Sequence, residues 1–153
     1  MKFVITGSSG FIGYHLSDSL DGSIPFDLSH ENAIGNGDIT ILDNILNASK
    51  NCDGIIHLAA ISRVSDCEHD PKKCIDVNIN GTLNVLQAAI KNNIKWVGII
   101  TTGEVQWIEN NKIQSFNKIN NVYGVSKLAS ELLVDVIGSK AGLKSTIFRI
   151  SSV

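Results

Sequence analysis

A tyrosine and a lysine four residues apart have the clearest chemical use in this sequence. Tyr123 and Lys127 begin a segment with helical spacing, so both side chains lie on one helix face, one turn apart. An ammonium group beside a phenol favours the phenolate and lowers the phenol pKa from about 10 toward the range of a general base. The pair therefore indicates proton abstraction, although an ordinary amphipathic helix can also carry these two residues.

Three glycines follow the first apolar run of the chain. Gly7 and Gly10 follow an expected strand, Lys2–Thr6, and Gly13 lies in the first turn of an expected helix, Phe11–Leu20. Glycines here permit a tight turn, a close approach of the backbone to a pyrophosphate, and close packing of helix on strand. The helix N-terminus adds unpaired N–H groups and a partial positive charge. This context predicts a dinucleotide phosphate site, while strand-to-helix turns also use glycine for structural reasons alone.

An acidic residue at the end of the second expected strand bears on the choice of cofactor. Asp27 stands 20 positions after Gly7. A carboxylate at this place accepts hydrogen bonds from the adenosine ribose hydroxyls and repels a 2′-phosphate, which favours NAD over NADP. The alternative is a surface aspartate in a turn. Asp38 and Ile39, in the sequence Gly-Asp-Ile, form a second candidate contact with the adenine end.

The elements that must position these residues alternate between short apolar runs and longer helical patterns. This alternation predicts an α/β fold, a Rossmann-type doubly wound parallel sheet. The expected strands are Lys2–Thr6, Ile24–Asp27, Gly54–Ala60, Trp96–Thr102 and Ser145–Ile150, of which the last three are expected at the sheet centre, covered on both faces. Further helices are expected around Ile79–Ile90 and Val125–Val136, and a loop over 108–121.

Length and composition exclude several classes of protein. We expect one domain over 1–153, because 153 residues with 43% hydrophobic and 18% charged residues suit a single core. A net charge of -2 argues against a nucleic-acid partner. Three cysteines without a CxxC pair indicate reduced thiols and no metal site, with Cys67, His69 and Cys74 expected in a surface loop. Without a signal-peptide core or a membrane-spanning run, we expect a cytoplasmic protein.

The motifs, in their order, resemble the extended short-chain dehydrogenase/reductase family, in its NAD-dependent nucleotide-sugar epimerase/dehydratase branch. The resemblance covers nearly the whole chain. It rests on GSSGFIG at 7–13, GDI at 37–39, DGIIHLAA at 53–60, NINGTLNVL at 78–86, TTGEV at 101–105 and YGVSK at 123–127.

This resemblance implies a role for each matching residue. Tyr123 is the implied general base on a sugar hydroxyl, while the hydride passes to NAD. Lys127 would hold the nicotinamide ribose and tune Tyr123, and Thr102 would hydrogen-bond the same hydroxyl and steady the developing oxyanion. Asn78 would anchor the sheet near the cofactor. The implied cofactor contacts are Gly7, Ser9, Gly10, Phe11, Ile12, Gly13, Asp27, Asp38, Ile39, Leu58, Ala59, Ala60, Asn78, Thr101, Tyr123 and Lys127.

The resemblance also implies a nucleotide-sugar substrate and a homodimer through the helices at 74–92 and 123–139. Some positions depart from the family pattern. Gly103 replaces the first acid that the dehydratases carry after the threonine, Glu104 is either a proton acceptor or a surface carboxylate, and Gln106 and Trp107 replace the usual Tyr-Gly. From the resemblance we expect the chain to be the cofactor-binding half only, without the substrate domain, and so to bind NAD with weak sugar turnover.

Two other functions compete with a nucleotide-sugar epimerase or dehydratase. One is a non-catalytic NAD-binding module or subunit, which senses the cofactor or binds a partner through an unfinished sheet edge. The other is a reductase of a small carbonyl compound, which needs the same Thr102, Tyr123 and Lys127 but an open site. The type of reaction and the identity of the sugar stay open at this point.

Overall fold

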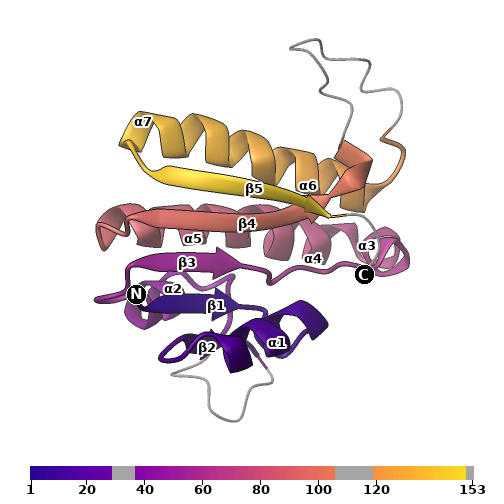
Figure 1. Cartoon of the computed structure of the whole chain (residues 1–153). Helices are drawn as coiled ribbons and strands as arrows, with labels where there is room; N and C mark the ends of the chain where they lie inside the picture. Colours follow the sequence, from indigo (N-terminus) through magenta and orange to yellow (C-terminus); the bar gives the residue numbers. More distant parts are fainter. Residues whose placement is uncertain (29–36, 106–118, 151–153) are drawn as a thin grey trace.

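The chain folds around a five-stranded parallel sheet (Figure 1). The computed structural model describes residues 1–28, 37–105 and 119–150. The strands are β1 (Phe3–Thr6), β2 (Ile24–Phe26), β3 (Gly54–His57), β4 (Trp96–Thr102) and β5 (Lys144–Ile150). Their order across the sheet is β2-β1-β3-β4-β5, so the chain moves outward from β1 in both directions. Residues 108–118 of the expected loop lie outside the described residues.

Helices cover both faces of the sheet. Helix α1 (Phe11–Ser19) lies on one face, and α5 (Gly81–Lys91) and α6 (Val122–Leu133) lie on the other (Figure 1). Helix α2 (Leu42–Ala48) packs beside α5. Because right-handed crossovers that move in opposite directions place their helices on opposite faces, this is the arrangement of a doubly wound sheet. The Rossmann-type α/β fold expected from the sequence is confirmed.

One expectation about the sheet is wrong. The run from Ser145 to Ile150 was expected at the sheet centre, but β5 is an edge strand of the described sheet, and Phe148 is 44% exposed. The run also contains the polar residues Ser145, Thr146 and Arg149, as an edge strand permits. The central strands are β1, β3 and β4. Strand β3 also ends at His57 rather than Ala60, because the chain there leaves the sheet.

The core lies between the sheet and α5. Val4, Ile55 and Val97 stand in register on β1, β3 and β4, and none is exposed to solvent. Val85 and Leu86 of α5 pack in the same cluster and are also fully buried. Burial of side chains of this size stabilises a fold by about 1.5–3 kcal/mol each. This layer fixes the positions of the strand ends on which the site depends.

Two long helical segments carry the residues of chemical interest. The first runs through α4 (Pro71–Ile75), the π-helical turn η1 (Asp76–Asn80) and α5, and the second through α6, the π-helical turn η4 (Val134–Gly138) and α7 (Ser139–Ala141). Each begins with a side-chain cap. Asp70 accepts a hydrogen bond from the Lys73 backbone N–H at 3.0 Å, and Asn121 accepts one from the Gly124 N–H at 2.7 Å.

The cysteine-bearing segment is helical, contrary to the surface loop expected for it. Cys67 lies on α3 (Val64–His69) and Cys74 on α4, and both side chains are fully buried. The Asp70-Pro71 pair, a capping residue followed by proline at the first helical position, signals the start of α4 in the sequence. Within the described residues, no group of metal-ligating side chains is arranged to hold an ion.

Candidate functional site

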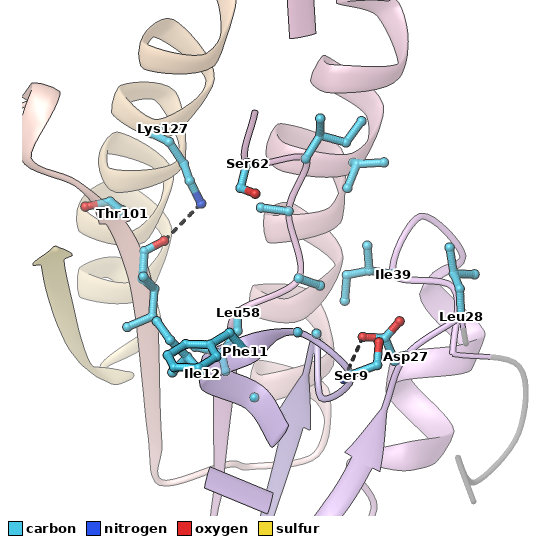
Figure 2. A pocket seen from close by; sticks show the side chains of 18 of the residues that line it. Ser9, Phe11, Ile12, Asp27, Leu28, Ile39, Leu58, Ser62, Thr101 and Lys127 are labelled. Atoms are coloured by element: carbon cyan, nitrogen blue, oxygen red, sulfur yellow. Dashed lines mark hydrogen bonds between the residues drawn. The ribbon is translucent and has the colours of Figure 1, made fainter. Parts of the chain in front are cut away.

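A cleft of about 820 Å³ opens at the carboxyl ends of the strands. Ligands of doubly wound sheets bind at this edge, where loops from neighbouring strands diverge. The cleft is lined by every cofactor contact expected from the sequence except Asn78, and also by Thr102. Figure 2 shows the wall from Ser9 and Asp27 at one end to Lys127 at the other.

The glycine-rich turn between β1 and α1 forms the floor of the cleft. Gly7 has a left-handed backbone, with φ of 72°, and a Cβ there would lie 2.6 Å from the Ala59 backbone nitrogen. A Cβ on Gly13 would lie 2.1 Å from the Gly7 carbonyl oxygen. Only glycine therefore allows this turn to lie against both the segment after β3 and the first turn of α1. The N-terminus of α1 then faces the cleft, as an anion site requires.

Asp27 is held beside this turn. Its carboxylate accepts a hydrogen bond from the Ser9 backbone N–H at 3.1 Å (Figure 2). Gly37 packs against the backbone of Asp27, since a Cβ at Gly37 would lie 2.1 Å from the Asp27 carbonyl oxygen. The Asp38 carboxylate accepts hydrogen bonds from the Thr40 N–H at 2.8 Å and hydroxyl at 2.7 Å. Two carboxylates thus stand at the same end of the cleft, at the places expected for adenosine contacts.

Lys127 places a buried amine at the other end. Its side chain is only 8% exposed, and Nζ donates a hydrogen bond to the Ile100 carbonyl at 3.0 Å (Figure 2). Nζ also lies 5.9 Å from the centre of the Tyr123 ring. Burial lowers the pKa of Lys127 to about 8, against the opposing effect of Cys67, Cys74 and Glu131. Lys127, Tyr123 and Thr102 all line the cleft.

A buried ion pair fixes α6 on the last two strands. The Glu131 carboxylate, one turn after Lys127, accepts hydrogen bonds from Arg149 Nη2 at 2.7 Å and Nε at 3.0 Å. It also accepts one from the Thr101 hydroxyl at 2.6 Å. Thr101 therefore directs its hydroxyl to the helix side of β4, although the residue lines the cleft. Hydrogen bonding to Glu131 raises the pKa of Arg149.

Asn78 lies behind the cleft wall rather than on it. Its side-chain oxygen accepts a hydrogen bond from the Ile61 N–H at 2.8 Å, and its amide donates to the Ile61 carbonyl at 3.1 Å and the Ser126 hydroxyl at 2.9 Å. The structure therefore gives Asn78 an anchoring position, between the segment after β3 and helix α6, and no place in the cleft lining. This corrects its expected place among the cofactor contacts.

Sequence reasoning missed several cleft residues. Lys73 and Val77 line the cleft from consecutive turns of one helical segment, and Ser62 lines it from the segment after β3. The four-residue spacing of Lys73 and Val77 after the cap at Asp70 could have found the first two. The side chain of Glu104, like Gln106 and Trp107, lies outside the part of the chain that is described.

The fold and the site together define a dinucleotide-binding α/β protein with a buried Lys beside a Tyr. Residues 3–153 match the NAD dependent epimerase/dehydratase family. The inverting UDP-N-acetylglucosamine 4,6-dehydratase of Campylobacter jejuni is 31% identical over 115 residues, which are 75% of this chain and 31% of that protein. A putative UDP-glucose 4-epimerase of Methanocaldococcus jannaschii is 27% identical, with 98% of this chain and 55% of that protein covered.

Solved structures agree with these sequence matches. The UDP-glucose 4-epimerase of Thermotoga maritima, solved with UDP-glucose, matches with a TM-score of 0.80 at 27% identity. The match covers 97% of this chain and 55% of the Thermotoga chain. The chain belongs to the NAD-dependent epimerase/dehydratase family. It spans from about a third to about half the length of the two curated relatives named above. Among the helices described, none is long and apolar enough to cross a membrane.

The buried Lys127 gives stability a defined pH dependence. Its pKa is about 8 in the folded chain against an ordinary 10.5, so the unfolded chain binds more protons between these pH values and stability rises with pH. Burial of the charged form lowers the free energy of unfolding by its full amount below pH 8, and this loss disappears by pH 10.5. Over this range we expect the free energy of unfolding to rise by about 3 kcal/mol more in the wild type than in Lys127→Met. Urea unfolding across the range checks this, and parallel pH curves would contradict it.

Proposed function

We propose that this chain forms the NAD-binding half of a nucleotide-sugar epimerase or dehydratase, with Thr102, Tyr123 and Lys127 at the reacting end of its cleft. The observation that carries the proposal is the buried Lys127 amine, 5.9 Å from the Tyr123 ring. Burying a charged group is costly, so its presence in a cleft lined by a phenol favours a chemical role. The family match and the relatives' nucleotide-sugar substrates support the substrate class.

The cleft suits NAD at both ends. The glycine turn leaves room for a pyrophosphate at the N-terminus of α1, where a Cβ on Gly7 or Gly13 would collide with backbone. Asp27 stands where it would accept from the adenosine ribose hydroxyls, and Lys127 where it would hold the nicotinamide ribose. NAD, when bound, supplies the hydride acceptor at the sugar carbon.

The remaining steps belong to the chain's own side chains. Tyr123, as the phenolate, takes the proton from a sugar hydroxyl, and the nearby Lys127 ammonium stabilises the phenolate. The Thr102 hydroxyl donates a hydrogen bond to the sugar oxygen as negative charge develops there. The oxidised sugar is the shared starting point for epimerisation and for water elimination. Gly103 stands in place of one of the acids that the dehydratases carry, so water elimination lacks one of its expected acids here.

A non-catalytic NAD-binding module is the second candidate. Strand β5 leaves a sheet edge open in the described structure, with Phe148 partly exposed, and such an edge can accept a partner. The same cleft would then bind NAD without turnover. Assays of sugar nucleotides and small ketones separate this candidate, and the small-carbonyl reductase, from the proposed function.

Cofactor choice tests the role of Asp27. A ligand at a hundredfold excess over its Kd stabilises a folded protein by about 2.7 kcal/mol, so a thermal melt reports binding. We expect NAD to raise the midpoint more than NADP, because the Asp27 carboxylate repels a 2′-phosphate. Asp27→Asn removes the charge and should lower the ratio of the NADP Kd to the NAD Kd by about tenfold or more. Asp43→Asn, at an exposed position of α2, is the control. Equal shifts with NAD and NADP in the wild type would contradict the assignment.

Tyr123→Phe separates catalysis from binding. Loss of the phenol should lower conversion of the nucleotide sugar by about a hundredfold or more, because general base catalysis contributes roughly 10²–10⁴-fold. The Kd for NAD should stay within about twofold, because the ring that contacts the cofactor is kept. Turnover is followed by chromatography of the nucleotide-sugar product, because the hydride returns to the sugar in each cycle and NADH does not accumulate, and binding is followed by calorimetry. Unchanged turnover in Tyr123→Phe would contradict the assigned base, and NAD binding without turnover in the wild type would favour the non-catalytic module.

We also propose a homodimer through α5 and α6. Helix α6 and the following turn η4 expose Val125, Leu132 and Val136 at 48–54%, seven and four residues apart on one side, and Ile90 on α5 is 39% exposed. An apolar stripe on neighbouring helices fits a second copy of the same stripe. Light scattering should show a dimer that Leu132→Glu converts to a monomer, while Leu28→Glu, at another exposed leucine, leaves it intact. A monomeric wild type would rule the dimer out.

A further inference from the structure

A row of buried polar side chains crosses the molecule behind the cleft. His57, at the end of β3, has its Nδ1 2.7 Å from the Thr6 hydroxyl of β1 and its Nε2 3.1 Å from the Thr82 hydroxyl of α5. All three side chains are at most 5% exposed. None of them lines the cleft. The proposed chemistry does not use them, yet buried polar groups of this kind are costly unless every partner is in place.

The partners of Thr6 determine where each proton lies. The Ala59 N–H lies 3.2 Å from the Thr6 hydroxyl oxygen, and an N–H can only donate. The Leu58 N–H lies at the same distance and is shared with the Thr6 carbonyl at 3.1 Å. The hydroxyl oxygen therefore accepts from this peptide, and within the described residues His57 Nδ1, at 2.7 Å, is the acceptor for its one proton. Nδ1 is therefore unprotonated.

The other side of the ring follows from this. Neutral His57 carries its proton on Nε2, which donates to the Thr82 hydroxyl oxygen. The Thr82 hydroxyl donates in turn to the Asn78 carbonyl at 2.6 Å. The Ser130 hydroxyl of α6 donates to the same carbonyl at 2.9 Å. The Ser130 hydroxyl also lies 2.9 Å from the Ser126 carbonyl of its own helix. The row thus connects β1 with the helix that carries Lys127.

The Thr6 end of the row holds a part of the cleft wall. The Ala59 N–H has the Thr6 hydroxyl as its partner among the described residues. The same Leu58–Ala59 peptide packs on Gly7, whose Cα has no room for a side chain. Leu58, Ala59 and Gly7 all line the cleft. The Thr6 hydroxyl therefore helps to hold this peptide against the glycine turn, together with the bond from the Leu58 N–H to the Thr6 carbonyl.

We propose that His57 is a positioning residue: as the Nε2–H tautomer it orients the Thr6 hydroxyl, which holds the Leu58–Ala59 peptide in the conformation that binds the dinucleotide. The expected effect on NAD binding rests on the proposed NAD site, whereas the hydrogen bonds of the row do not. Protonation of His57 would put a second donor against Thr6. Burial, together with the facing Lys127 charge, lowers the pKa of His57 to about 3, so the ring stays neutral at physiological pH.

The tautomer can be observed without any ligand. In a long-range nitrogen–proton NMR spectrum of the whole chain, His57 should show an unprotonated Nδ1 and a protonated Nε2 that do not change between pH 5 and 8, as expected for a pKa of about 3. His69, on the exposed surface, provides a reference imidazole outside the row. A protonated Nδ1, or titration of His57 within this range, would overturn the inference.

Paired variants test the positioning itself. Thr6→Val removes the hydroxyl at nearly constant shape, and Thr6→Ser keeps a hydroxyl. His57→Phe removes the acceptor of that hydroxyl, and His57→Asn provides another acceptor. Hydrogen exchange at the Ala59 amide should be about tenfold faster in Thr6→Val and His57→Phe, because one hydrogen bond is lost. The Ile56 amide, inside β3, should exchange at the wild-type rate. Faster exchange at both amides would indicate general destabilisation and would overturn a positioning role.

Cofactor affinity completes the test. We expect the Kd for NAD to rise about tenfold in Thr6→Val and His57→Phe and to recover in Thr6→Ser and His57→Asn. Thr146→Val, a threonine of β5 outside the cleft lining, is the matched control with an unchanged Kd. Faster Ala59 exchange with unchanged NAD affinity would overturn the inference. If the wild type binds no NAD, the proposed function fails, while the tautomer and the exchange rates still decide whether His57 orients Thr6.

Discussion

The ammonium group of Lys127 is buried beside the cleft, and several surrounding groups provide the hydrogen bond and the negative charge that stabilise it there. An isolated buried ammonium is costly unless it is hydrogen-bonded and balanced by charge. The Ile100 carbonyl accepts its hydrogen bond at 3.0 Å, and the Glu131 carboxylate one turn along α6 provides negative charge. Glu131 is itself paired with Arg149 of β5. The position of the amine thus depends on the packing of α6 against both β4 and β5.

Most of the fold could be predicted because the strands are apolar runs and the helices have clear periods. Strand β4 has the predicted bounds, and the other strands differ from prediction by one to three residues at an end. The place of β5 at the edge of the sheet could not be predicted, because the burial of a strand depends on which strands lie beside it. The sequence of the strand alone does not show this order. Helices α2, α3 and α4 are short, and their apolar faces are too brief to show a helical period.

The candidate site divides in the same way. Residues whose backbone or position forms the site, such as Gly7 and Asp27, could be placed from spacing, because strand ends of a parallel sheet meet at one edge. Residues whose side chains turn away from the cleft could not be placed from the sequence. Asn78 and Thr101 direct their polar groups to Ile61 and Glu131, and only the three-dimensional packing of η1 and α6 decides this. The position of the His57 proton likewise follows from the contacts of the Thr6 hydroxyl with the Ala59 N–H and His57 Nδ1, which the sequence does not show.

The close approach of Gly37 to Asp27 has a consequence for how this chain can vary. The backbones of residues 27 and 37 are in contact, so the chain returns at residue 37 to the place that it left at residue 27. The entropy of closing a loop grows only slowly with its length, by about 0.6 kcal/mol for each doubling. The contact between these two backbones, rather than the number of residues between them, therefore fixes where Asp27 and Asp38 lie at this end of the cleft.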